Sequence, residues 1–110
     1  MSSHAKQRCS AQEYLELERR AATKSEFFAG EIFAMTGASR DHNLIVANLV
    51  RELTLELKGR PCETYPSDMR VKVNATELYT YPDLAVVCGP PQFDDEQKDT
   101  LLNPTLIVEV

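Results

Sequence analysis

The sequence predicts a single domain of the α/β (α+β) class. Its 110 residues are 43% hydrophobic and 26% charged, which is ordinary for a globular protein and enough for one core. One long stretch repeats apolar residues at helical spacing, and several short β-branched runs follow it. Helices followed by strands favour a fold in which helices and a sheet pack in layers.

The N-terminal third predicts a tail, a short helix and a hairpin. Residues 1–9 are polar, and we expect a disordered tail there. Ser10 and Glu13 match a capping box, which predicts a helix over residues 11–22. Two aromatic-rich runs then flank an Ala-Gly pair, which predicts a β-hairpin over residues 25–35.

The longest predicted helix covers residues 41–58. Ser39 is the expected N-cap, Gly59 follows the last turn, and Pro61 blocks any continuation. The apolar stripe makes this helix the expected main helical contribution to the core. Its members recur every four residues: Ile45, Leu49, Leu53 and Leu57.

After Pro61 the pattern is that of β-strands. Residues 81–89 and 105–110 are nearly continuous apolar runs, and we expect them to be central strands covered on both faces. The acidic run between them is expected to be a solvated loop. Shorter strands are predicted over residues 62–65, 68–73 and 78–81.

Composition excludes several classes of protein. The net charge of -5 argues against a protein that coats nucleic acid, although not against an enzyme that touches it locally. No apolar run approaches the roughly 20 residues of a membrane span, and the N-terminus lacks the apolar region of a secretory signal. Three cysteines without CxxC spacing predict reduced thiols and a cytoplasmic protein.

Each of the two apolar runs carries one carboxylate. Asp83 opens the first run and Glu109 lies near the end of the second. Two acids on neighbouring strands can bind Mg²⁺ or Mn²⁺, which would stabilise charge on a phosphodiester and help to generate a hydroxide. The alternative is that Asp83 caps the turn after Pro82 and that Glu109 is an exposed edge-strand residue.

Three further residues are second-tier candidates for the same site. His42 could lie near the metal, or it could be a polar residue beside the helix N-cap. Asp68 could add a carboxylate, or it could form a turn before its strand. Glu31, directly after the hairpin glycine, could belong to the site, or it could be a residue of the hairpin without a role in it. Arg70 and Lys72 are candidates for contacts to phosphate, with a solvated strand face as the alternative.

These motifs together resemble the Uma2 family, a branch of the PD-(D/E)xK restriction-endonuclease-like superfamily. The similarity covers about residues 11–110, and no single motif is as specific as the set in order. It is carried by residues 24–32, residues 34–39, His42, residues 67–71, residues 81–87 and residues 103–110.

The resemblance implies a mixed central sheet flanked by helices and a metal-dependent DNA endonuclease. Asp83 and Glu109 would be the catalytic acids and metal ligands, and the backbone carbonyl of Val110 would be a further ligand. The cofactor would be Mg²⁺ or Mn²⁺ and the substrate DNA.

The chain departs from the family pattern after Glu109. In the family the last strand continues into a segment that supplies a catalytic lysine, whereas here no Lys or Arg follows Lys98. We therefore expect residues 1–110 to be a C-terminally truncated domain, incomplete or inactive by itself. The alternative is a non-catalytic interaction module that forms a homodimer through its exposed C-terminal strand, residues 105–110.

Overall fold

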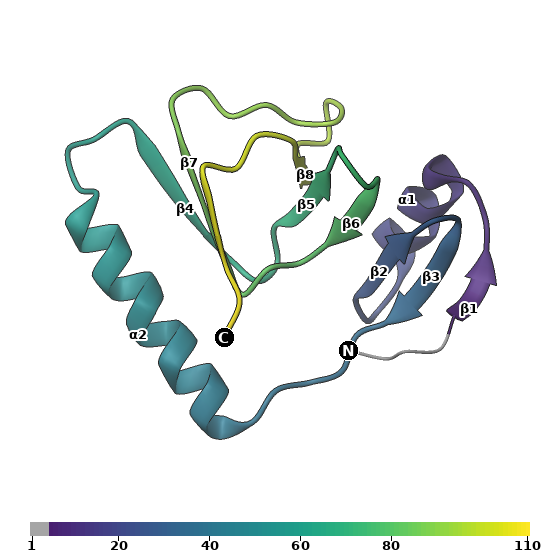
Figure 1. The fold of residues 1–110 in the computed structure, drawn as a ribbon, viewed down its shortest axis with the longest axis horizontal. Helices are drawn as coiled ribbons and strands as arrows, with labels where there is room; N and C mark the ends of the chain where they lie inside the picture. Colours follow the sequence, from purple (N-terminus) through teal and green to yellow (C-terminus); the bar gives the residue numbers. More distant parts are fainter. Residues whose placement is uncertain (1–4) are drawn as a thin grey trace. The chain divides into compact units, whose positions relative to one another are not determined.

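The computed structural model describes residues 5–110, and their side chains from residue 8 onward. The contacts divide the chain into two compact units (Figure 1). The first unit contains the described part of Met1–Gly37 together with Lys72–Thr80, and the second contains Ala38–Val71 and Tyr81–Val110. No helix in the described part of the chain is long and apolar enough to cross a membrane.

The predicted α/β class is confirmed, and the pairing of the strands is mixed. Parallel pairing joins β5 to β8, and the pairs of the β4-β7-β9 sheet are antiparallel. In chain order, the described elements are β1 (Ala5–Arg8), α1 (Ala11–Arg20), β2 (Ser25–Phe28), β3 (Glu31–Ala34), α2 (Arg40–Glu56), β4 (Cys62–Pro66), β5 (Arg70–Val73), β6 (Leu78–Thr80), β7 (Leu84–Cys88), β8 (Thr100–Leu101) and β9 (Leu106–Val108).

The core of the first unit is an aromatic cluster that docks α1 on the sheet. Tyr14 is fully buried, and its ring centroid lies 5.0 Å from that of Phe27 and 5.5 Å from that of Tyr79. Its hydroxyl donates a hydrogen bond of 2.6 Å to the carbonyl of Ser25. The helix begins at the predicted capping box of Ser10 and Glu13.

The hairpin of the first unit is confirmed, and its turn explains the Ala-Gly pair. Ala29 and Gly30 both have positive φ, the conformation that a two-residue hairpin turn with the right twist requires. The strand order in this unit is β1-β3-β2-β6. Of the predicted tail, residues 1–4 lie outside the described residues, whereas residues 5–8 form β1 and pair with β3.

The core of the second unit is built on β7. Residues Leu84–Val87 are buried, and β7 lies between β4 and β9 in an antiparallel sheet. The prediction of a covered central strand is therefore confirmed for β7. It is wrong for β9, which is at the sheet edge, with Leu106 44% and Ile107 38% exposed. The strand is apolar, but nothing in the described part of the chain covers it on both faces.

The long helix α2 is confirmed, with Ser39 as its N-cap, but it does not supply the core. None of its residues is buried, and Leu44, Ile45 and Leu55 are large exposed apolar side chains. The helix runs beside β4 (Figure 1), and of its apolar stripe Ile45 is exposed while Leu49, Leu53 and Leu57 are half-buried. Periodicity predicted the helix correctly and its burial incorrectly.

Arg70 corrects two predictions at once. The residue is only 4% exposed. Its guanidinium group donates to Thr100 Oγ1 at 2.9 Å and to the Tyr81 hydroxyl at 2.8 Å. It also forms an ion pair with Asp99 at 2.9 Å. Arg70 is therefore a buried structural cation and not a contact for phosphate, and Asp99, a 37% exposed member of the acidic loop, has Arg70 as its partner.

The prediction of three reduced thiols is wrong for two of them. Cys62 and Cys88 face each other in the β4–β7 register and form a disulfide, with Cα atoms 4.0 Å apart. Cys88 was expected in the core, but it ends β7 and is exposed. Cys9 is the free cysteine, and burial and the charge of Glu13 raise the pKa of its thiol.

Substitution of Tyr14 tests the aromatic core of the first unit. We expect Tyr14→Ala to lower the free energy of unfolding by about 3–5 kcal/mol, because it removes a fully buried ring. Tyr14→Phe keeps the ring and loses one hydrogen bond, which costs about 1 kcal/mol. Urea unfolding followed by circular dichroism measures both, with exposed Leu17→Ala on the same helix as control. Equal losses for the two Tyr14 variants would contradict this account.

Candidate metal centre

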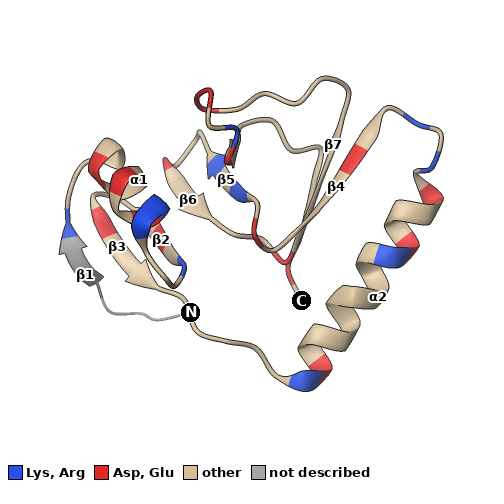
Figure 2. Cartoon of the chain, turned by 180° about the vertical axis from the view of Figure 1, so that it is seen from behind, with Lys and Arg blue, Asp and Glu red and all other residues tan. Residues whose placement is uncertain are grey.

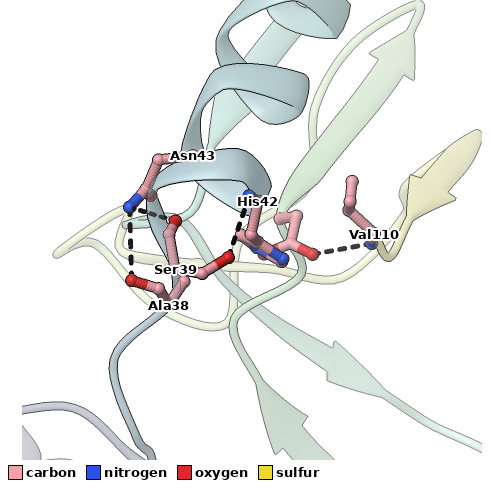
Figure 3. A network of polar contacts seen from close by, with 6 residues as sticks. Ala38, Ser39, His42, Asn43 and Val110 are labelled. Carbon is pink, nitrogen blue, oxygen red and sulfur yellow. Dashed lines mark hydrogen bonds and ion pairs between the residues drawn. The ribbon is translucent and has the colours of Figure 1, made fainter.

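Asp83 is held at the start of β7 by contacts to both carboxylate oxygens. Its Oδ1 lies 3.0 Å from His42 Nε2, and its Oδ2 accepts a hydrogen bond of 2.8 Å from the backbone N–H of Val110 (Figure 3). The side chains of His42 and Asp83 are 25% and 19% exposed. Residues from α2 and the C-terminal strand therefore converge on one partly buried carboxylate.

The N-terminus of α2 fixes the position of His42. Ser39 Oγ accepts the backbone N–H of His42 at 3.1 Å, and Asn43 Nδ2 donates to the carbonyl of Ser39 at 3.0 Å (Figure 3). An N-cap of this kind is worth about 1 kcal/mol to a helix. The cap sets where the first turn begins, and the first turn carries the imidazole to Asp83.

The register between β7 and β9 relates Asp83 to Glu109. The ladder between β7 and β9 ends where Leu84 pairs with Val108. Asp83 precedes β7 and Glu109 follows β9, so each acid is the first residue beyond its strand at the same end of the sheet. Glu109 is an exposed residue, as in the edge-strand interpretation.

The other two candidate acids occupy different surroundings. Asp68 is an exposed residue in the turn before β5, where the N–H of Met69 bonds to the carbonyl of Pro66. Glu31 belongs to the first unit and forms an ion pair with Arg8 at 2.5 Å. Among the described residues, no three His, Cys, Asp or Glu side chains form a group that could hold a metal ion. Protein side chains alone therefore do not complete a cage.

This donor set fits a divalent cation that keeps open positions. Mg²⁺ is usually bound by one or two carboxylates, with water and substrate phosphate in the other positions. Asp83, Glu109 and the carbonyl of Val110 are oxygen donors of the kind it requires. His42, predicted as a second-tier candidate near the metal, lies beside Asp83, whereas the hydrogen bond from the backbone N–H of Val110 to Asp83 was not predicted, because 27 positions separate these residues.

Charges of both signs occupy α2 next to the candidate site. Arg40 and Asp41 form an exposed ion pair at the first turn, and Arg51 and Glu52 form another further along. Figure 2 shows the same alternation of basic and acidic residues along the helix. Exposed pairs of this kind contribute little to stability and leave no strong positive field along the helix.

Comparisons with known proteins agree with one another. Residues 11–110 match the model of the Uma2 family, described as "Putative restriction endonuclease". Two relatives come from Synechocystis sp. (strain ATCC 27184 / PCC 6803 / Kazusa). The uncharacterized protein sll1609 is 45% identical over 91% of this chain and 56% of its own length, and the uncharacterized protein slr1290 is 38% identical over 92% and 52%.

A solved structure shares the fold. It is the crystal structure of "a putative nuclease belonging to DUF820" from Anabaena variabilis ATCC 29413, with a TM-score of 0.70 at 19% identity over 92% of this chain and 57% of the other. The chain thus spans about half the length of the proteins it matches. Because the family model covers nearly the whole sequence, this chain belongs to the Uma2 family.

Proposed function

We propose that this chain carries the metal-binding acids of a metal-dependent DNA endonuclease that hydrolyses phosphodiester bonds. The observation that carries the proposal is the position of Asp83, a partly buried carboxylate just before the buried strand β7, at the sheet end where Glu109 follows β9. The family description and the solved nuclease-like neighbour support the same class of reaction. The choice of DNA as the proposed substrate rests on the family and not on a groove in this chain.

In this proposal Asp83, Glu109 and the carbonyl of Val110 would hold Mg²⁺ or Mn²⁺. The bound cation would supply charge stabilisation at the scissile phosphate and a more acidic water. The protein's own contribution is orientation. The N–H of Val110 fixes one oxygen of Asp83 and the imidazole of His42 fixes the other, so the carboxylate is held in one direction. Asp68 and Glu31 have no part in it.

The proposed reaction also requires a cation that offsets the charge of the transition state. Within these 110 residues no Lys or Arg follows Lys98, and Arg70 is already engaged by Tyr81, Thr100 and Asp99. We therefore propose that residues outside this half of the relatives' length complete the activity. The chain by itself would bind metal better than it cleaves DNA.

Metal binding tests the central residue of the proposal. We expect calorimetric titration with Mn²⁺ to show one weak site in the wild type and a loss of at least tenfold in affinity in Asp83→Ala. Asp83→Asn should lose nearly as much while preserving the shape of the side chain. Asp94→Ala, an exposed acid in the loop after β7, is the matched control and should bind as the wild type does. Equal binding by all four proteins would show that Asp83 is no ligand.

Cleavage of supercoiled plasmid tests the reaction. We expect the 110-residue chain to nick DNA slowly or not at all with Mg²⁺ or Mn²⁺. The reason is that no Lys or Arg follows Lys98 within these residues to supply the required positive side chain. Any nicking should fall in Asp83→Asn and Glu109→Gln. Gel quantification of relaxed and linear DNA measures the rate, with EDTA as the blank. Robust Mg²⁺-dependent cleavage by the wild type would refute the inferred need for a further cation.

A second candidate function is assembly through β9. This strand pairs with β7 along one edge, and the residues around it leave Leu106, Ile107 and Val110 38–45% exposed. An edge strand with exposed apolar side chains is a template for pairing with another chain. The chain could then act as a non-catalytic module that forms a homodimer.

Light scattering after size exclusion tests assembly. If β9 pairs between copies, the wild type should be a dimer and Ile107→Lys should shift the mass to that of a monomer, because edge-strand lysines block pairing. Leu55→Lys, on the exposed face of α2, is the control and should leave the dimer intact. A wild-type protein that stays monomeric across a range of concentrations excludes this function.

A further inference from the structure

The contact between His42 and Asp83 brings two kinds of metal-binding atom together. Nε2 of His42 and Oδ1 of Asp83 are 3.0 Å apart, and the side chains come from the first turn of α2 and the residue before β7. Both side chains keep some exposure to solvent, so an ion can reach them. The other oxygen of Asp83 is fixed by the N–H of Val110, which limits how the carboxylate can rotate.

The separation of the two atoms is also that of neighbouring ligands on a metal. Cis ligands about 2.1 Å from an octahedral ion lie about 3.0 Å from each other. A cation can therefore replace the proton between nitrogen and oxygen after the two side chains turn their lone pairs toward a common point.

The nitrogen donor has a consequence for which metal binds. Carboxylate, carbonyl and water ligands suit Mg²⁺, whereas imidazole suits Zn²⁺ and the later first-row dications, whose affinities for such sites exceed that of Mn²⁺. We propose that His42 Nε2 is a direct ligand beside Asp83 and that the site selects a dication such as Co²⁺ or Zn²⁺ over Mg²⁺. This inference rests on the proposed function, since it uses Asp83 as a ligand.

The remaining coordination positions are open. Among the described residues no group of three His, Cys, Asp or Glu side chains is gathered around this pair, so apart from the proposed donors Glu109 and the carbonyl of Val110, water or a substrate oxygen would fill the other positions. A metal centre with open positions is the kind that performs chemistry, whereas closed four-ligand sites are structural. The expected affinity is modest, and the informative quantity is the ratio of affinities between metals.

Calorimetric titration of the 110-residue chain with CoCl₂, ZnCl₂ and MgCl₂ tests the inference. All proteins carry Cys9→Ser, which removes the free thiol as a competing ligand. We expect Co²⁺ and Zn²⁺ to bind at least tenfold more tightly than Mg²⁺. His42→Ala and His42→Gln should each abolish that preference and change the Mg²⁺ affinity by less than threefold. The matched control is His4→Ala, which replaces the other histidine of the chain and should retain the wild-type preference.

The two histidine variants separate ligation from positioning. Gln can still bond to Asp83 but is a poor metal ligand, so a wild-type metal preference in His42→Gln would overturn the inference. The visible absorption of bound Co²⁺ gives a second readout, because loss of a nitrogen ligand should shift its bands in both variants. Circular dichroism confirms that each variant is folded.

The results also separate this inference from the proposed function. Binding that depends on Asp83 but not on His42 overturns the histidine ligand and leaves the acidic site standing. The absence of any Asp83-dependent binding, for all three metals, overturns both. A preference for Co²⁺ and Zn²⁺ that His42 controls supports this inference whether or not the 110-residue chain cleaves DNA, because cleavage by this chain alone is expected to be slow or absent.

Discussion

The carboxylate of Asp83 is the group that joins three segments of the second unit at one end of the β4-β7-β9 sheet. It accepts from the imidazole of His42 on one oxygen and from the backbone N–H of Val110 on the other. Hydrogen bonds to a charged group are worth about 1.5–3 kcal/mol each. One side chain therefore links the start of α2, the start of β7 and the end of the β9 strand. Asp83 is held in place because β7, the strand that follows it directly, is buried along most of its length.

Two charged groups of the second unit show how structure and function differ in this chain. Arg70 is almost completely buried beside Thr100, Tyr81 and Asp99, so a ligand from solvent cannot reach its guanidinium group. Asp83 has protein donors on both oxygens but remains partly exposed, and each oxygen of an ionised carboxylate has a further lone pair. The first arrangement is closed to solvent, whereas the second leaves lone pairs of the carboxylate within reach of solvent.

Local patterns in the sequence predicted local structure, and pairings between distant residues escaped them. The caps at Ser10 and Ser39 were predictable because their partners lie three residues away. The disulfide between Cys62 and Cys88 depends on the β4–β7 register, which no sequence pattern gives. The burial of Arg70 was missed for the same reason. Alternation places a residue on one face of a strand. It does not say whether that face is exposed to solvent or packed against another segment of the chain.

The exposed apolar surfaces bear on the candidate site because they begin beside it. Leu44 and Ile45 lie in the turns of α2 next to His42, and Leu106 and Ile107 lie on the strand that leads to Val110. Burying apolar surface is worth about 25 cal/mol for each Å² removed from water, so these side chains favour contact with another element. Any element that covers them both packs against the two segments that hold Asp83. Under the proposed function, such an element would also limit the access of water to the carboxylate of Asp83.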